Sequence, residues 1–546
     1  MYALLRAGLW CPPATFLGPV AQGYDAAVKT PVPRRGAPAV AGLVVVALVL
    51  EAAYALFILW PMRICSRPVS PHVHLVGTFG VDRGGALRYM LTVAVLFALY
   101  GLALWLVVRR SGWWEEADRP GGRLSLWPVL GGAVLFCATL VPTHPLSSTD
   151  LFNYMAGARI AWVHHDNPLT VPPLAYPGDR FVMLVLNWRD IPSPYGPLWM
   201  LVSGLPLALG GGRPLATVIA FKATAAAFLL GTGLLAAAVA ARLRPGSGPL
   251  ALLAFTWNPL AVWHAAGNGH NDAVMVFFLA LAAFLLARGL PGPALVALTA
   301  SALVKFATLL LLPLLAVWWW RGGCSGISRR AGDRHARGQV MPWLPVCALL
   351  VVLAYAPFWQ GWDTFRAALD EGSYFTVSFP AVLRGALTRV FSVGVAEMVS
   401  AWTGRAAFLA VYAALLWRLN GRGLEPFLAT AALVLGAYLL LAATYFAPWY
   451  VLWPFSLAAM VPWRREVFLP ALALTLTAMS VLLWATWVRA RFAADPLADW
   501  YPMHLLTVLS VVPLPVAVWW ATRREAGRVS KCPRASGAGR GLPHWR

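Results

Sequence analysis

Long apolar runs recur along the whole chain, separated by short polar segments. A helix needs about 20 apolar residues to span a bilayer, whereas strands of a membrane barrel alternate over about ten residues. The continuous runs therefore predict an all-α fold, a polytopic transmembrane helix bundle of about 13–15 spans. We expect spans near 37–60, 87–108, 124–141, 215–241, 248–266, 272–288, 291–304, 306–320, 341–358, 404–420, 427–446, 448–462, 467–487 and 503–521.

Two apolar segments do not fit a simple series of spans. We predict that the segment 195–212 dips into the membrane without crossing it. The run from Pro291 to Trp320 contains Lys305 near its centre. One continuous helix would hold this charge at mid-membrane, at a cost of a few kcal/mol. Two short spans that meet at Lys305 would instead place the ammonium group at the membrane surface.

Composition and charge agree with a membrane protein. Hydrophobic residues make up 60% of the 546 residues and charged residues only 12%, about half the charged fraction of a soluble protein. The formal net charge of +22 would favour nucleic acid as a partner in a soluble chain, but here the basic residues are scattered through loops and tails. We therefore predict that no nucleic acid is bound, and attribute the surplus to loops retained in the cytoplasm.

Charge also predicts the topology. With the N-terminus inside, most of the 43 Lys and Arg fall in inner segments. This predicts a multi-pass protein of a bacterial plasma membrane with both termini cytoplasmic. We expect a cytoplasmic tail over 1–36, a transmembrane domain over 37–522 and a second cytoplasmic tail over 523–546. Two large outer loops are predicted, at 142–194 and 359–403, and the polar motifs fall on this outer side.

The first polar motif is STDLFNYMAGARI, which opens the first outer loop. A carboxylate at the edge of a span must be solvated or paired, so Asp150 faces a cavity as a general base or caps the helix that follows. Ser148 and Thr149 are alternative caps. Arg159 lies further along the same predicted helix.

The second motif is WRDIPSPYGPLW, whose prolines and glycine predict a rigid extended segment. Arg189 pairs with the neighbouring Asp190 or binds a phosphate in a bidentate manner. Tyr195 offers a flat apolar face with a polar edge, which suits either a membrane interface or a sugar ring.

Three further motifs follow on the predicted outer side. The turn GNGHND contains His270, Asn271 and Asp272, which are structural turn residues or contact a substrate, and are too few to define a metal site. Lys305 either snorkels to the interface or binds a lipid phosphate. The stretch TYFAPWYVLWPF places Trp449 and Tyr450 in a proline-broken turn, which an aromatic interface belt alone does not explain.

Taken together, these motifs resemble the GT-C superfamily of integral-membrane glycosyltransferases. The chain is most similar to the polyprenol-phosphate-mannose-dependent alpha-1,6-mannosyltransferases of bacterial cell-envelope assembly. STDLFNYMAGARI, WRDIPSPYGPLW, NPLAVWHAAGNGHNDA, ALVKF and APWYVLWP carry the resemblance, between about Pro142 and Pro454. Thr149 before the acid departs from the Gln or Ser that is common in the family. The resemblance implies a GT-C bundle with a helical outer loop that carries the active site.

The resemblance also implies partners and roles. The partners are a polyprenyl-phosphate sugar donor, a glycan or glycolipid acceptor and the lipid bilayer. Asp150 would act as the base in an inverting transfer of a hexose, most simply mannose. No cofactor and no metal is predicted, although a divalent metal is possible. The substrate-binding residues implied are Arg159, Arg189, Tyr195, His270, Asn271, Asp272, Lys305, Trp449 and Tyr450.

Two other functions remain open from the sequence. A flippase or exporter of lipid-linked sugars needs similar aromatic clefts and basic sites but no base. A ligase or polymerase of lipid-linked glycans would transfer an oligosaccharide and needs a larger outer groove.

Overall fold

The computed structural model describes residues 37–73, 79–80, 82–111, 125–323, 340–370, 374–419, 423–484 and 501–531. The predicted tail 1–36 lies outside these residues. Within the described ranges the regular structure is helical and the β contacts are isolated bridges. Eight helices are long and apolar enough to cross a membrane. The chain is thus an all-α, polytopic integral membrane protein, which confirms the predicted fold class.

The first half of the chain supplies the helices that surround the polar motifs. They are α2 (Ala37–Tyr54), α3 (Trp60–Met62), α5 (Arg83–Ser111), α6 (Leu126–Leu140), α7 (Asp150–Trp162), α8 (Pro197–Leu209), α9 (Pro214–Leu243), α10 (Gly248–Thr256), α11 (Pro259–Val262), α12 (Asp272–Ala287), α13 (Pro291–Val304) and α14 (Leu311–Trp320).

The second half of the chain completes the bundle. Its helices are α16 (Leu344–Tyr355), α17 (Arg366–Asp370), α18 (Phe379–Leu387), α19 (Val393–Arg418), α20 (Leu424–Ala437), α21 (Leu452–Ala458), α22 (Arg465–Ala478), α23 (Ser480–Leu483), α25 (Tyr501–Val511) and α26 (Pro513–Lys531). The helix α26 extends into the segment 523–546 that we predicted as a tail.

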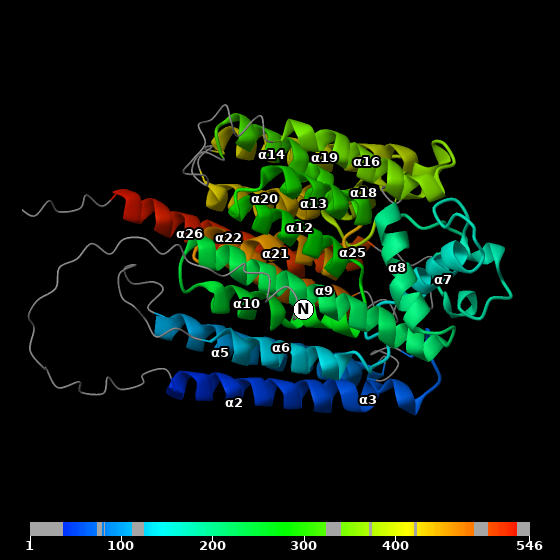
Figure 1. Ribbon diagram of the computed structural model, residues 1–546, viewed down its shortest axis with the longest axis horizontal. Coiled ribbons are helices and arrows are strands. Elements are labelled where there is room, and N and C mark those ends of the chain that lie inside the picture. Colours follow the sequence, from blue (N-terminus) through cyan, green and yellow to red (C-terminus); the bar gives the residue numbers. More distant parts are fainter. Residues whose placement is uncertain are drawn as a thin grey trace, which may run out of the picture.

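Most helices lie side by side along the long axis of the molecule (Figure 1). At one end, α7 and the loop that follows it form a cap, and α8 runs across the direction of the long helices. The start of α2 and the end of α26 lie at the opposite end. The helix α12 packs against α9, α13, α20 and α21, and therefore lies inside the bundle.

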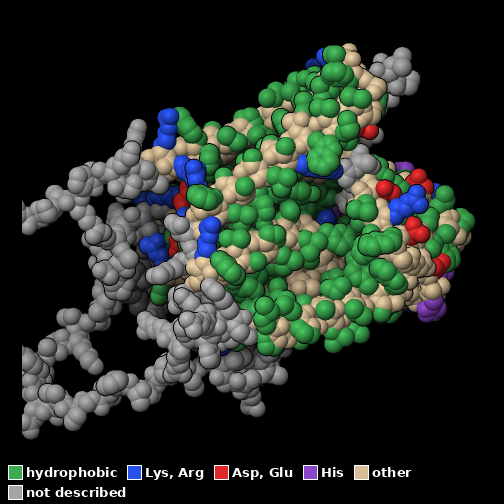
Figure 2. All heavy atoms as spheres, turned by 90° about the horizontal axis from the view of Figure 1, so that it is seen from above, with side chains coloured by type: hydrophobic (Ala, Val, Ile, Leu, Met, Phe, Trp, Pro, Cys, Tyr) green, Lys and Arg blue, Asp and Glu red, His purple; other side chains and the backbone are tan. Residues whose placement is uncertain are grey.

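The surface has the polarity of a protein in a bilayer. Figure 2 shows a broad apolar flank, with charged side chains gathered toward the two ends of the molecule. Large apolar side chains on this flank are exposed, among them Leu56, Leu205, Val352 and Leu409. Such a surface is unfavourable in water and is satisfied by lipid.

The predicted breaks in the apolar runs are present. The helix α13 ends at Val304, Lys305 has an extended backbone, and a short 3-10 helix (Phe306–Leu310) leads into α14. This confirms that two short helices meet at Lys305. The prediction of a proline-broken turn around 445–450 is also confirmed, since a 3-10 helix (Pro448–Val451) separates α20 from α21.

Other boundaries differ from the predicted ones. The predicted span 248–266 is broken at Asn258, whose side chain accepts hydrogen bonds from the N–H groups of Leu260 and Ala261 and so starts a new helix. The helix α19 begins at Val393 and not at 404, because Glu397 and the small residues near it lower the hydropathy of its first turns. The segment 359–403, predicted as the second outer loop, therefore contains the first turns of α19.

The number of spans stays a prediction. Besides the eight long helices, there are shorter apolar helices of 10–17 residues, which include α6, α8, α12 and α13. Helices of this length cross a bilayer only where neighbouring segments extend them. The helix α8 has 13 residues and lies across the capped end, an arrangement compatible with the predicted dip of 195–212.

Candidate active site

The carboxylate of Asp150 lies at the start of α7, at the capped end of the bundle. Asp150 is the first residue of the helix, and Thr149, at the capping position, makes no side-chain cap. The backbone N–H of Asp150 donates to Ser148 Oγ at 3.2 Å. The Asp150 side chain is 17% exposed, lies 3.8 Å from His270 Nδ1, and lines a cavity. This carboxylate therefore borders a space that a ligand can enter.

The turn between the π-helical segment Trp263–Gly267 and α12 carries His270 to this carboxylate. Gly269 in this turn has φ +74°, and a Cβ there would come within 2.9 Å of Leu151 Cδ1. Only glycine satisfies both conditions without strain. The turn is joined to the Asp150 loop because Asn268 Oδ1 accepts from Ser147 N–H at 2.9 Å. The GNGHND turn and the loop before Asp150, which are distant in the sequence, are thus in contact in the fold.

His270 is buried between Asp150 and an aromatic wall. Its ring stacks on Trp449 with centroids 3.9 Å apart. Burial, together with His264 and Lys305, holds the pKa of His270 well below its ordinary value. The imidazole is therefore neutral at physiological pH, and its 3.8 Å contact with Asp150 is not an ion pair.

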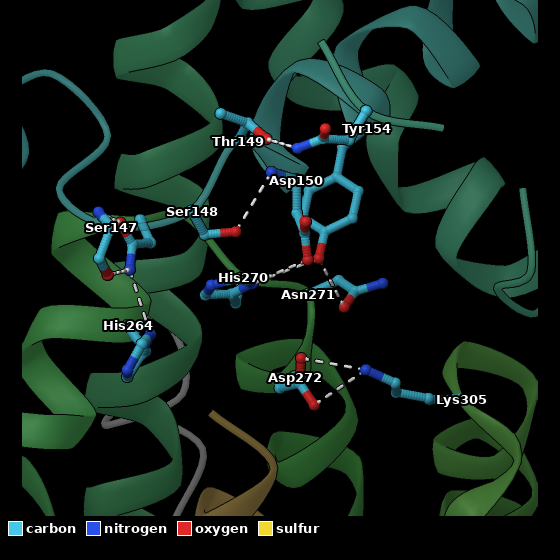
Figure 3. Close-up of polar contacts among 12 residues, drawn as sticks. Ser147, Ser148, Thr149, Asp150, Tyr154, His264, His270, Asn271, Asp272 and Lys305 are labelled. Atoms are coloured by element: carbon cyan, nitrogen blue, oxygen red, sulfur yellow. Dashed lines mark hydrogen bonds and ion pairs between the residues drawn. The ribbon is translucent and has the colours of Figure 1, made fainter. Parts of the chain in front are cut away.

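Tyr154 lies one helical turn after Asp150 and faces the same turn (Figure 3). Its hydroxyl lies 3.3 Å from Asn271 Oδ1 and 3.4 Å from His270 Nδ1. Burial raises the pKa of Tyr154 well above its ordinary value, so the phenol stays protonated. Tyr154 therefore donates a hydrogen bond to Asn271 and orients the side chains beside Asp150.

Asp272 and Lys305 form a buried ion pair below the cluster (Figure 3). Lys305 Nζ lies 3.2 and 3.3 Å from the two carboxylate oxygens of Asp272. Trp453 Nε1 donates to Asp272 at 2.6 Å. The ammonium group also lies over the rings of Tyr450 and Tyr195, at 4.2 and 5.3 Å from their centroids. Asp272 already neutralises this cation, which disfavours Lys305 as the group that meets a lipid phosphate.

The two arginines predicted to bind substrate are placed differently. Arg159 pairs with Asp179 at 2.6 Å, and His164 approaches the same carboxylate at 2.8 Å. Burial alone would raise the pKa of Asp179, but the hydrogen bonds from Phe181 N–H, Arg159 and His164 outweigh it and lower the pKa. Arg159 therefore stabilises the loop after α7 and lies outside the cluster. Arg189 does not join the cluster in the contacts between described residues, and its Nε is buried without a partner there.

The cavity beside Asp150 has a volume of about 80 Å³. Aromatic and proline side chains form much of its wall, including Trp188, Tyr374 and Tyr450. Trp188 has φ +66° and packs edge-on against Tyr374 at 5.0 Å. A bulky residue with positive φ is strained and is held by its surroundings, which is frequent at functional sites.

Comparison with known proteins shows the family of this chain. Residues 39–321 match the alpha-(1->6)-mannopyranosyltransferase family, N-terminal domain. The chain belongs to this family. The matched range holds Asp150, the GNGHND turn and Lys305, whereas Trp449 and Tyr450 lie beyond it.

Individual members of the alpha-(1->6)-mannopyranosyltransferase family are distant relatives. Alpha-(1->6)-mannopyranosyltransferase A of Mycobacterium tuberculosis is 25% identical over 397 residues, which cover 66% of this chain and 69% of the relative. Alpha-(1->6)-mannopyranosyltransferase A of Corynebacterium glutamicum is 26% identical, over 45% of this chain and 53% of the relative. Alpha-(1->6)-mannopyranosyltransferase B of the same organism is 22% identical over 423 residues. These relatives support a glycosyltransferase.

The structure adds Lys222 to the residues that hold the loop before Asp150. Lys222 lies in α9, is fully buried, and donates to Leu140 O at 2.8 Å and to Thr143 O at 2.5 Å. A cation is stabilised where a helix ends in unpaired carbonyl groups, here at the end of α6. A lysine inside an apolar run marks such a position. A lysine inside an apolar run was recognised in the sequence at Lys305 but not at Lys222.

Proposed function

We propose that this protein transfers a mannosyl group from a polyprenyl-phosphate-linked donor to a glycan or glycolipid acceptor, with inversion at the anomeric carbon. The observation that carries the proposal is the partly exposed Asp150 carboxylate, which lines a cavity walled by aromatic side chains. Aromatic faces bind sugar rings, and a positioned carboxylate accepts a proton. The names of the family and of its members support mannose as the sugar.

The reaction needs one base. The acceptor hydroxyl oxygen attacks the anomeric carbon, the carbon–oxygen bond to the phosphate breaks, and the hydroxyl proton passes to Asp150. The electron pair of the broken bond leaves with the polyprenyl phosphate. Retention would need a second carboxylate as nucleophile. Asp272 is engaged by Lys305 and Trp453, which favours a single displacement with inversion.

The remaining residues of the cluster would hold the base and the sugar. Tyr154 and the neutral His270 lie beside Asp150, while Asn271 and Tyr195 lie close to Tyr154. Among the described residues, no group of three His, Cys, Asp or Glu is arranged to hold a metal ion. That a metal is not required stays a prediction.

We also propose that the site faces outward from a bacterial plasma membrane, with both termini in the cytoplasm. The turn between α9 and α10 lies at the end opposite α7 and carries Arg244 (Figure 1). Arg288 follows α12 and lies close enough to Arg242 to affect it electrostatically. Basic loops are typical of the cytoplasmic side. A flippase would need polar groups accessible from both faces, whereas this cluster lies toward one end.

The test is mannosyl transfer in membranes that contain this protein, with radiolabelled polyprenyl-phosphate mannose as donor. Asp150→Asn should lower transfer by about 10²–10⁴-fold, because a general base contributes that much. The matched control is Asp166→Asn, in the same outer loop, where the carboxylate accepts a hydrogen bond from Tyr176. This control should retain most activity.

Three outcomes would count against the proposal. Near-normal transfer by Asp150→Asn would remove the base assignment. Label that reaches the opposite leaflet without a new glycosidic bond would indicate a flippase. Label that moves only as an oligosaccharide would indicate a ligase or polymerase.

A further inference from the structure

A second, larger cavity lies on the other side of the aromatic wall from Asp150. Its volume is about 470 Å³, within the range of ligand-binding pockets. Trp449, which stacks on His270, belongs to its wall. Tyr445 lines both this cavity and the one beside Asp150. The two cavities therefore adjoin through a shared aromatic side chain.

The walls of the two cavities differ in charge. Among the described residues, the cavity beside Asp150 is lined by this carboxylate and by no Lys or Arg. The second cavity is lined by Arg384 and by no Asp or Glu within the same part of the chain. An anionic ligand is repelled by the first cavity and attracted by the second.

The second cavity also has an extended apolar wall. Met479, Leu482, Met503 and Phe446 line it, from the end of α22, α23, the start of α25 and the turn before α21. Apolar side chains with flexible methionines suit an irregular hydrocarbon chain. The combination of one arginine and this wall matches a ligand with one anionic group on a long apolar tail.

The loop beside Arg384 is held in a strained conformation. Val377 has φ +35°, which is unfavourable for a β-branched residue. Its N–H donates to His504 Nδ1 at 3.1 Å, while Thr376 N–H donates to Thr444 O at 3.0 Å. Strain of this kind persists where surrounding contacts fix it, and it is frequent at ligand sites.

We propose that the second cavity binds the phosphate and the first isoprenyl units of the lipid donor, with Arg384 as the phosphate ligand. This inference rests on the proposed function, because it places the donor of that reaction. The sugar would then lie toward Tyr445, between the phosphate and the acceptor held beside Asp150. It also supplies a cation that is more accessible than Lys305, since the Arg384 side chain is 33% exposed whereas the Lys305 side chain is 9% exposed and paired with the buried Asp272.

The pairing of Arg384 with Glu397 permits a sharp test. Arg384 lies 2.8 Å from Glu397, and both side chains are about one third exposed, at 33% and 38%. If Arg384 only stabilises the fold through this pair, Arg384→Gln and Glu397→Gln should have the same effect. If Arg384 binds phosphate, Glu397→Gln leaves the cation in place and should preserve or strengthen binding, whereas Arg384→Gln should weaken it.

The measurement is equilibrium binding of tritiated farnesyl phosphate to the full-length protein in detergent, with tritiated farnesol as the neutral counterpart. Wild type should prefer the phosphate by about tenfold or more, the contribution of a charge-assisted contact. Arg384→Gln should abolish this preference. Mannose 1-phosphate, which lacks the chain, should compete weakly, and Leu482→Trp, which narrows the cavity, should weaken both farnesyl probes.

The matched control is Arg464→Gln. Arg464 is 34% exposed and pairs with Glu425 and Glu466, so its loss removes similar contacts elsewhere. It should leave the preference for phosphate unchanged. An unchanged preference in Arg384→Gln, or equal losses in Arg384→Gln and Glu397→Gln, would overturn the inference while the proposed function stands. No binding of farnesyl phosphate by wild type, together with no transfer from the polyprenyl donor, would overturn the proposed function itself.

Discussion

Two aspartates at helix starts, Asp150 and Asp272, show how surroundings decide the use of a carboxylate. Each is the first residue of its helix, α7 and α12; Asp272 ends the GNGHND turn, and Asp150 lies beside His270 of the same turn. Asp272 is fully buried and receives hydrogen bonds from Lys305 and Trp453. Asp150 is partly exposed, faces the neutral His270 and lines a cavity.

The difference separates a structural acid from the proposed base. The oxygens of Asp272 are engaged by a cation and an indole N–H, whereas the Asp150 carboxylate borders a cavity that a ligand can enter. Sequence position alone does not distinguish the two, because both follow a short polar turn and precede an apolar helix.

The largest expected effect is a loss of stability in Asp272→Asn. This change leaves Lys305 buried without a counter-charge and should lower the free energy of unfolding by about 3–5 kcal/mol. Asp150→Asn should lower it by less than about 1 kcal/mol. Thermal unfolding of the purified protein measures both. Similar unfolding temperatures for the two variants would remove the distinction between the aspartates.

A double variant sharpens this comparison. Asp272→Asn with Lys305→Met removes the unpaired charge and should recover about 2 kcal/mol or more relative to Asp272→Asn alone. The same unfolding measurement applies, with Lys305→Met alone as the reference. Additive losses in the double variant would mean that the two side chains do not act as a pair.

A smaller effect should come from His144, which lies in the loop before Asp150. Burial, with Lys222 and Arg67 nearby, lowers the pKa of His144 to about 4. The unfolded chain binds a proton near pH 6.5 and the folded chain does not, so stability should fall as pH drops from about 6.5 to about 4. We expect a loss of about 2 kcal/mol across this range.

The measurement is unfolding temperature against pH for wild type and His144→Gln. The variant should show a flatter profile between pH 6.5 and pH 4. A profile in His144→Gln as steep as that of wild type would assign the pH dependence to other groups.

The smallest effect concerns Tyr154, which lies beside the proposed base Asp150. Tyr154→Phe removes one hydroxyl near Asn271 and His270 and should lower transfer by about five- to tenfold, equivalent to about 1 kcal/mol. Stability should change little by comparison. Tyr412→Phe is a matched control, because it removes a hydroxyl that donates to Leu310 O, in contacts that do not involve Asp150 or His270. Equal transfer by wild type and Tyr154→Phe would exclude this tyrosine from the site.

The sequence predicted the helical class and the breaks at Lys305 and near Trp449. Apolar length and proline positions determine these features locally. It did not predict that Asp272 would neutralise Lys305, or that Asp179 would bind Arg159, because these pairs depend on how distant segments pack. The hydrogen bonds of Lys222 to the end of α6 also depend on tertiary contacts that no local pattern encodes. The same holds for the cavity beside Arg384.

The contact of Lys222 with the end of α6 has a consequence for biosynthesis. During synthesis, α6 and the Asp150 loop leave the ribosome before α9. The carbonyl groups of Leu140 and Thr143 therefore lack the hydrogen bonds from Lys222 until α9 has inserted. During this interval the loop is anchored only by earlier segments. A nascent chain arrested before Lys222 should therefore expose the Asp150 loop to protease, and one arrested after α12 should protect it.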